Sequence, residues 1–91
     1  MTLDYDSSDK LDAKIATIRK TDKRLAEVLL NKMNEVLSRD ETTIEFYKNL
    51  KSPMQEFKRV HIGSFVLTFK FLKKEKLVYF EDFDHHDKIY Q

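Results

Sequence analysis

The amino-acid sequence predicts an α+β fold, in which an N-terminal antiparallel pair of helices packs on one face of a small twisted antiparallel sheet. As far as Leu37, apolar residues recur with the 3.6-residue period of a helix. From Phe57 onward they alternate with a period of two, which is typical of half-buried strands. With 91 residues, the chain is expected to form one domain that spans residues 1–91.

Two amphipathic helices are expected before the strands. Each has candidate N-caps in front of it, Ser7 or Ser8 for the first and Thr21 or Asp22 for the second. The first helix has apolar positions at i, i+4 and i+7, namely Leu11, Ile15 and Ile18. The second has a longer apolar stripe, formed by Leu25, Val28, Leu29, Met33, Val36 and Leu37. Stripes of this width face a core, so we expect both helices to cover the sheet.

The sheet is expected to be an antiparallel meander. Residues 38–55 lose the helical period and contain the single proline, Pro53, so they are expected to form an irregular connection with one helical turn near residues 44–50. Gly63 and Ser64 then suit a two-residue turn with glycine first. The three main strands are expected at residues 57–62, 64–71 and 76–83. A short strand around residues 3–5 could extend the sheet at its edge.

The alternation also predicts which side of the sheet stays open. One face of the middle strand is apolar and carries Phe65, Leu67, Phe69 and Phe71. If the helices cover that face, then Arg59, His61 and Lys70 project from the opposite one. We therefore expect the functional residues on this open face.

Composition excludes several classes of protein. The chain is 41% hydrophobic and 36% charged, which is typical of a globular protein, and it has no cysteine for disulfides or thiolate chemistry. No apolar run approaches the roughly 20 residues of a membrane span, and the acidic N-terminus does not resemble a signal peptide. We therefore expect a cytoplasmic protein with no membrane partner.

The net charge of +1 hides an uneven distribution. Between residues 46 and 74 a single acid, Glu56, accompanies seven basic residues, namely Lys48, Lys51, Lys58, Arg59, Lys70, Lys73 and Lys74. Such a segment indicates either a surface that meets an anion or a solvated, lysine-rich sheet edge.

The C-terminal segment FEDFDHHDKIYQ, residues 80–91, raises three alternatives. It could be an acid/base site, a soluble tail, or a metal site formed by Asp82, Asp84, His85, His86 and Asp87. Adjacent residues of an extended segment point in opposite directions, so we expect one of His85 and His86 to face the site and the other to pair with a neighbouring acid. The acid/base interpretation is preferred and the metal interpretation comes last. No cofactor is expected.

Two stretches carry a resemblance to a known family. KRVHIGSFVLTF resembles the central hairpin of RelE-type toxins, and DHHDKIY resembles their C-terminal end. The order of elements is also similar over nearly the whole chain. The resemblance implies the α+β fold of the RelE/ParE superfamily and a cognate antitoxin that wraps and neutralises the protein. RelE-like members cleave mRNA in the ribosomal A site without metal, whereas ParE-like members poison DNA gyrase.

Carried over by position, the resemblance implies catalytic residues Arg59, His61, His86 and Tyr90. The RNA- or phosphate-binding residues are expected to be the lysines Lys48, Lys51, Lys58 and Lys70. The sequence departs from the family at Val66, where an arginine commonly follows the aromatic residue. Lys70, on the same face of the strand, is the candidate to replace that arginine in part.

These residue types suit RNA cleavage without a metal. One histidine would accept the proton of the 2′-hydroxyl and the other would protonate the leaving 5′-oxygen, and the sequence does not assign the two roles. Arg59 suits phosphate binding, and Tyr90 suits base stacking or hydrogen bonding. Together with these residues, the resemblance implies a ribosome-dependent mRNA endonuclease, the toxin of a toxin–antitoxin pair.

Two alternatives remain open. One is a non-catalytic member of the same fold, either a gyrase inhibitor or a relic that only binds its antitoxin, which Val66 favours. The other is a small RNA-binding domain, and the orientation of the phenylalanines toward the expected core argues against it.

Overall fold

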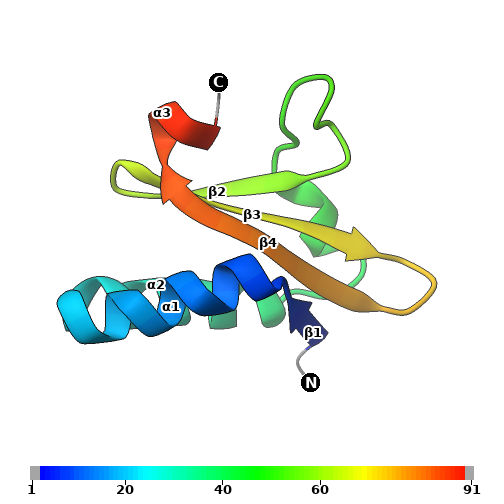
Figure 1. The fold of residues 1–91 in the computed structure, drawn as a ribbon. Coiled ribbons are helices and arrows are strands. Elements are labelled where there is room, and N and C mark those ends of the chain that lie inside the picture. Colours follow the sequence, from blue (N-terminus) through cyan, green and yellow to red (C-terminus); the bar gives the residue numbers. More distant parts are fainter. Residues whose placement is uncertain (1–2, 90–91) are drawn as a thin grey trace.

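The structure is a computed structural model that describes residues 3–89, and it has two layers (Figure 1). Two helices cover one face of a four-stranded sheet, as predicted. The elements in chain order are β1 (Asp4–Ser7), α1 (Asp9–Thr21), α2 (Lys23–Leu37), the 3₁₀ helix η1 (Thr43–Phe46), β2 (Lys58–Ile62), β3 (Phe65–Leu72), β4 (Leu77–His85) and α3 (His86–Ile89). None of the helices within the described range is long and apolar enough to cross a membrane.

Side-chain caps begin the two long helices at the expected positions. The Ser8 hydroxyl accepts a hydrogen bond from the backbone N–H of Leu11 at 3.0 Å, and the Asp22 carboxylate accepts one from the N–H of Leu25 at 3.1 Å. Asp22 alone separates α1 from α2, so the chain reverses direction there and the two helices lie side by side.

The sheet has the strand order β1-β4-β3-β2. Strands β2, β3 and β4 form the predicted antiparallel meander, but β1 pairs in parallel with β4 along Asp4–Ser7. The sheet is therefore mixed and not purely antiparallel as expected. Periodicity indicates that a segment is extended, but it does not encode the direction in which the strand pairs.

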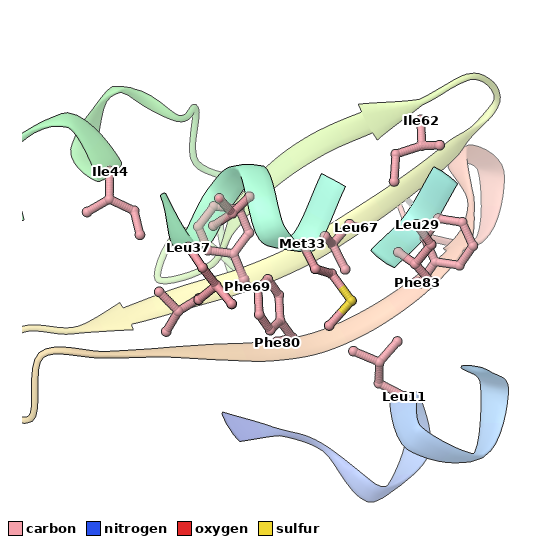
Figure 2. Close-up of a cluster of buried hydrophobic side chains, with 12 residues drawn as sticks. Leu11, Leu29, Met33, Leu37, Ile44, Ile62, Leu67, Phe69, Phe80 and Phe83 are labelled. Carbon is pink, nitrogen blue, oxygen red and sulfur yellow. The ribbon is translucent and has the colours of Figure 1, made fainter. Parts of the chain in front are cut away.

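The core lies between the helices and the sheet (Figure 2). Leu29 and Met33 of α2 belong to the same buried cluster as Leu67 and Phe69 of β3, and the rings of Phe69 and Phe80 lie 6.0 Å apart. Replacing one of these buried phenylalanines with alanine typically costs ~3–5 kcal/mol of stability. The face of β3 that carries Leu67 and Phe69 is thus the covered face, as predicted.

The connections place the remaining segments around the opposite face. The expected helical turn of the 38–55 connection is η1, and the chain then returns beside β2, where the Arg59 N–H donates to the Lys48 carbonyl at 2.9 Å. Gly63 has φ +61°, in agreement with a tight turn that has glycine first. In Figure 1, α3 and the loop before β2 both rise from the face of the sheet opposite α1 and α2.

Candidate functional site

The predicted open face exists. Arg59 pairs across the strands with Thr68, and His61 pairs with Val66. These two β3 partners alternate with the core-facing positions Leu67 and Phe69. Residues that are directly paired in an antiparallel ladder project to the same side. Arg59 and His61 therefore lie on the face away from α1 and α2.

His86 joins His61 on this face. The two imidazole rings stack with centroids 5.8 Å apart and an interplanar angle of 28°. His86 is the first residue of α3, and its backbone N–H donates to the Ser64 carbonyl at 2.8 Å, which fixes α3 to the turn between β2 and β3. The structure therefore brings together two histidines that are 25 positions apart in the sequence.

His85 points elsewhere, as expected for the neighbour of His86 in an extended segment. It ends β4 opposite Phe65, and its ring meets the Phe65 ring edge-on at 5.7 Å. Both histidines lie near Asp87, with Nδ1-to-carboxylate distances of 3.8 Å for His85 and 3.6 Å for His86.

A cavity of about 500 Å³ adjoins His86. The loop before β2 forms one wall, α3 forms the other, and Arg59 contributes from β2. The lining residues are Leu50, Lys51, Ser52, Pro53, Met54, Arg59, His86 and Ile89. A polyanion could therefore meet Arg59, Lys51 and His86 in one place.

Two of the predicted phosphate-binding lysines are exposed near this cavity. A third, on the sheet, contacts aromatic rings. Lys48 and Lys51 are exposed on the loop before β2. The Lys70 ammonium lies over the rings of Phe57 and Tyr79, at 5.2 Å and 5.7 Å from their centroids. These cation–π contacts orient the Lys70 ammonium on the open face.

Lys58 does not lie on the open face. It alternates with Arg59 and shares the covered face with Val60 and Ile62, and the residue is only 6% exposed. Its ammonium contacts the preceding loop and η1, donating to the Tyr47 carbonyl at 3.3 Å and to Asn49 Oδ1 at 3.1 Å, with Glu45 Oε2 3.8 Å away. Because this buried ammonium is occupied with the protein's own groups, we do not include Lys58 in the proposed RNA site.

The acids of β4 are engaged by α1 and not by the histidines. Lys14 Nζ lies 2.7 Å from Asp82 Oδ1 and 2.9 Å from Asp84 Oδ2. The hydrogen bond from Lys14 lowers the pKa of Asp84. Burial opposes the charged form of Lys14, but its hydrogen bonds to Asp82 and Asp84 outweigh that effect and raise the pKa of Lys14. Asp82, Asp84 and Asp87 are the acids expected to pair with the second histidine. Lys14 engages the first two, and Asp87 is the acid that lies near His85.

The same ion pairs bear on the metal alternative. Among residues 3–89, no three His, Cys, Asp or Glu side chains converge in a geometry that could hold a metal ion. Asp82 and Asp84 point to Lys14 and not to the histidines.

Val66 is fully buried beside His61 and Asp84, its partners on the two adjacent strands. An aliphatic side chain therefore occupies the place where the family commonly has an arginine. Tyr90, the remaining predicted catalytic residue, lies outside the described residues.

Several residues of the site region were missed by sequence reasoning. Lys14 lies on the polar side of α1, and nothing in the local pattern indicates its partners. Met54, Pro53 and Ile89 line the cavity but belong to irregular or terminal segments without a period. A signal did exist for Lys58, because the period of two places it on the same face as Val60 and Ile62.

Comparison with known proteins agrees with the geometry. No family model matches the chain. Over 82 residues the chain is 44% identical to the "Putative toxin RelE4" of Methanocaldococcus jannaschii, covering 89% of this chain and 83% of the relative. It is also 44% identical over 82 residues to an uncharacterized protein of Methanosarcina mazei, covering 89% of this chain and 91% of that one.

Solved structures share the fold at low sequence identity. YafQ from E. coli superimposes with a TM-score of 0.73 at 17% identity, covering 98% of this chain and 99% of YafQ. A chain of the toxin–antitoxin complex RelBE2 from Mycobacterium tuberculosis also gives a TM-score of 0.73, at 14% identity, covering 93% of this chain and 92% of that one. With the 44% identity to a RelE relative, the chain belongs to the RelE family of toxins of toxin–antitoxin systems.

Proposed function

We propose that this toxin is a ribosome-dependent endonuclease that cleaves mRNA in the cytoplasm. The observation that carries the proposal is the pair formed by His61 and His86, whose rings stack 5.8 Å apart on the open face. The Arg59 side chain and His86 line the same cavity. Membership of the RelE family supports this reading, because members of this family are generally mRNA endonucleases.

The chemistry follows from what an imidazole pair can do. One ring, neutral, accepts the proton of the 2′-hydroxyl, and the 2′-oxygen attacks the adjacent phosphorus. The bond from phosphorus to the 5′-oxygen breaks, and the second ring, protonated, gives its proton to that oxygen. The products are a 2′,3′-cyclic phosphate and a 5′-hydroxyl. One ring gains the proton of the 2′-hydroxyl and the other loses the proton that goes to the 5′-oxygen.

The cations of the open face would stabilise the negative charge that develops on the phosphate. Arg59 is best placed for the scissile phosphate because its guanidinium can bind two phosphate oxygens at once and it lines the cavity with His86. Lys70 would meet a second phosphate along the sheet, while Lys48 and Lys51 would attract the strand from the loop. Tyr90 stays a candidate for base stacking or hydrogen bonding near the C-terminus.

The partners of this function are the ribosome, its mRNA and a cognate antitoxin. The structural neighbour from M. tuberculosis was solved as a toxin–antitoxin complex, which supports an antitoxin partner for this chain. An antitoxin that covers the open face would keep RNA away from His61 and His86.

A non-catalytic toxin is the second candidate, and Val66 favours it. Without an arginine at this fully buried position, the phosphate has one fewer cation near the histidine pair. On this alternative the protein would inhibit DNA gyrase or only bind its antitoxin.

In vitro translation of a defined mRNA tests the two candidates. Purified protein is added with and without ribosomes, and the 5′ ends are mapped by primer extension. We expect cuts within codons that need ribosomes and that disappear with His86→Ala. Intact mRNA with the folded wild-type protein would reject the endonuclease, and DNA damage in expressing cells would then select the gyrase inhibitor.

A further inference from the structure

The loop wall of the cavity beside His86 is held in shape by its own hydrogen bonds. The bonds join Leu50 N to the Phe57 carbonyl at 2.9 Å, Met54 N to the Lys51 carbonyl at 2.9 Å, Phe57 N to the Met54 carbonyl at 3.0 Å, and Asn49 Nδ2 to the Gln55 carbonyl at 2.7 Å. The buried Lys58 ammonium attaches the base of the loop to β2. The wall is therefore built before any ligand arrives.

This loop presents apolar side chains to the cavity beside the polar Lys51 and Ser52. Leu50, Pro53 and Met54 line the loop side, and Ile89 lines the α3 side. Met54 is 40% exposed, so its thioether chain is available to a ligand. A flat ring gains from apolar contacts on two sides of a cavity, because both of its faces leave water.

The charge at the cavity selects the kind of flat ligand. Arg59, Lys51 and His86 are among the lining residues, and no acid within residues 3–89 is among them. A phosphate ion alone would leave the apolar walls in water, and an apolar ligand would make no use of Arg59 and Lys51. A nucleotide satisfies both requirements, and a volume of about 500 Å³ is in the range of small-molecule sites.

We propose that this cavity binds one nucleobase of the RNA strand, next to the phosphate that faces Arg59 and His86. The base would lie between the apolar side chains of the two walls, with Met54 and Ile89 as its main contacts. The choice of RNA as the ligand rests on the proposed endonuclease function. Ser52, the hydroxyl in the lining, can both donate and accept hydrogen bonds, so the cavity would tolerate all four bases.

The test measures binding separately from cleavage. A fluorescently labelled adenosine trinucleotide with 2′-O-methyl riboses cannot be cleaved, and versions lacking the base at one of the three positions are compared with it by anisotropy. At one position we expect loss of the base to weaken binding about fivefold to tenfold. The Met54→Ala and Ile89→Ala variants should weaken binding of the intact trinucleotide by a similar factor.

The decisive result is the coupling between base and wall. If the base contacts Met54, removing the base and truncating Met54 together should weaken binding little more than either change alone. The second change then removes a contact that is already lost. Val28→Ala is the matched control: Val28 on α2 is also 40% exposed, and this variant should bind every trinucleotide as the wild type does.

The outcomes separate this inference from the proposed function. Three results would each overturn the base-binding cavity. The first is a loss of affinity from the missing base that multiplies independently with the loss from Met54→Ala. The others are unchanged binding by Met54→Ala and Ile89→Ala, and no binding by the wild type. Coupled losses in a protein that does not cleave mRNA would keep the cavity and reject the endonuclease. Cleavage that depends on His86, together with uncoupled losses, would keep the endonuclease and reject the cavity.

Discussion

The ammonium of Lys14 on α1 lies 2.7 Å from the Asp82 carboxylate and 2.9 Å from the Asp84 carboxylate of β4. β1 pairs with β4 only as far as Phe80, so this last part of β4 has α1 beside it in place of a strand. The same part of β4 leads directly into α3 and His86. Lys14 therefore connects the helical layer to the strand that carries the candidate site.

Lys14→Met should lower the free energy of unfolding by ~1–3 kcal/mol, because it removes the ammonium that hydrogen-bonds to both partly buried carboxylates. Urea denaturation measures the change. Lys10→Met is the control: Lys10 Nζ lies 3.5 Å and 3.6 Å from Glu81 and Asp82 and is more exposed, so less than ~1 kcal/mol is expected. Equal effects of the two variants would contradict a special role of Lys14.

The Lys14 ion pairs also predict how stability depends on pH. The pKa of Asp84 is lower in the folded protein than its ordinary value of 3.8, so below that pH the unfolded chain binds more protons. The contribution of Asp84 is therefore complete above pH 3.8 and is lost as the pH falls through its folded pKa. The pKa of Lys14 is raised above 10.5, so its contribution is complete below that pH and is lost as the pH rises further.

Urea midpoints measured across the acid range check this prediction. The wild type should lose stability more steeply than Lys14→Met as the pH falls below 3.8. Identical slopes for the two proteins would show that Lys14 does not hold the Asp84 carboxylate in its charged form.

The two neighbouring histidines should differ in activity. His86→Ala should reduce the rate of mRNA cleavage by about 10²–10⁴-fold, because His86 faces His61 and would act in proton transfer. His85→Ala should change it less than about threefold, because the His85 ring packs against Phe65 instead. Both are half-exposed, so folding is not expected to distinguish them. Equal losses would remove His86 from the proposed pair.

Substitutions of Lys58 and Lys51 should have different effects, the first on stability and the second on RNA binding. Lys58→Met should lower the free energy of unfolding by ~1–3 kcal/mol, because the Tyr47 carbonyl and Asn49 lose their donor. Hydrogen exchange at the Leu50 and Arg59 amides, which close the loop, should become faster. Lys51→Met should leave stability unchanged and weaken RNA binding. A Lys58→Met protein that is as stable as the wild type but binds RNA more weakly would contradict the structural role of Lys58.

Substitution of Gly63 should destabilise the protein because of its backbone conformation alone. Its φ of +61° is in the left-handed region, and no described heavy atom beyond Gly63 and its two chain neighbours lies within 4 Å of the position that a Cβ would take. Gly63→Ala should therefore destabilise the protein by ~1 kcal/mol without a steric clash. Ser64→Ala in the same turn is the control, with no change expected in a thermal unfolding experiment. A loss of several kcal/mol from Gly63→Ala would indicate a contact that this geometry does not contain.

Much of the site could be read from the sequence because it depends on alternation along two strands. The period of two places Arg59 and His61 on the face opposite Leu67 and Phe69, and the register of β2 and β3 agrees. Lys58 shows the limit of reasoning from charge: its type indicated phosphate binding, while its position in the alternation indicated the covered face. In this case position was the better guide, because a lysine can be buried when the protein supplies acceptors for its ammonium.

The sequence by itself determined the helical pair, the three-stranded meander and the side of the sheet that carries Arg59 and His61. Caps, turns and periods act among residues a few positions apart, so they can be recognised locally. Only the tertiary structure decided the parallel pairing of β1 with β4, the position of Lys14 between Asp82 and Asp84, and the cavity between the loop and α3. These features join segments far apart in the chain, and their distances follow from how the layers pack, which no local pattern encodes.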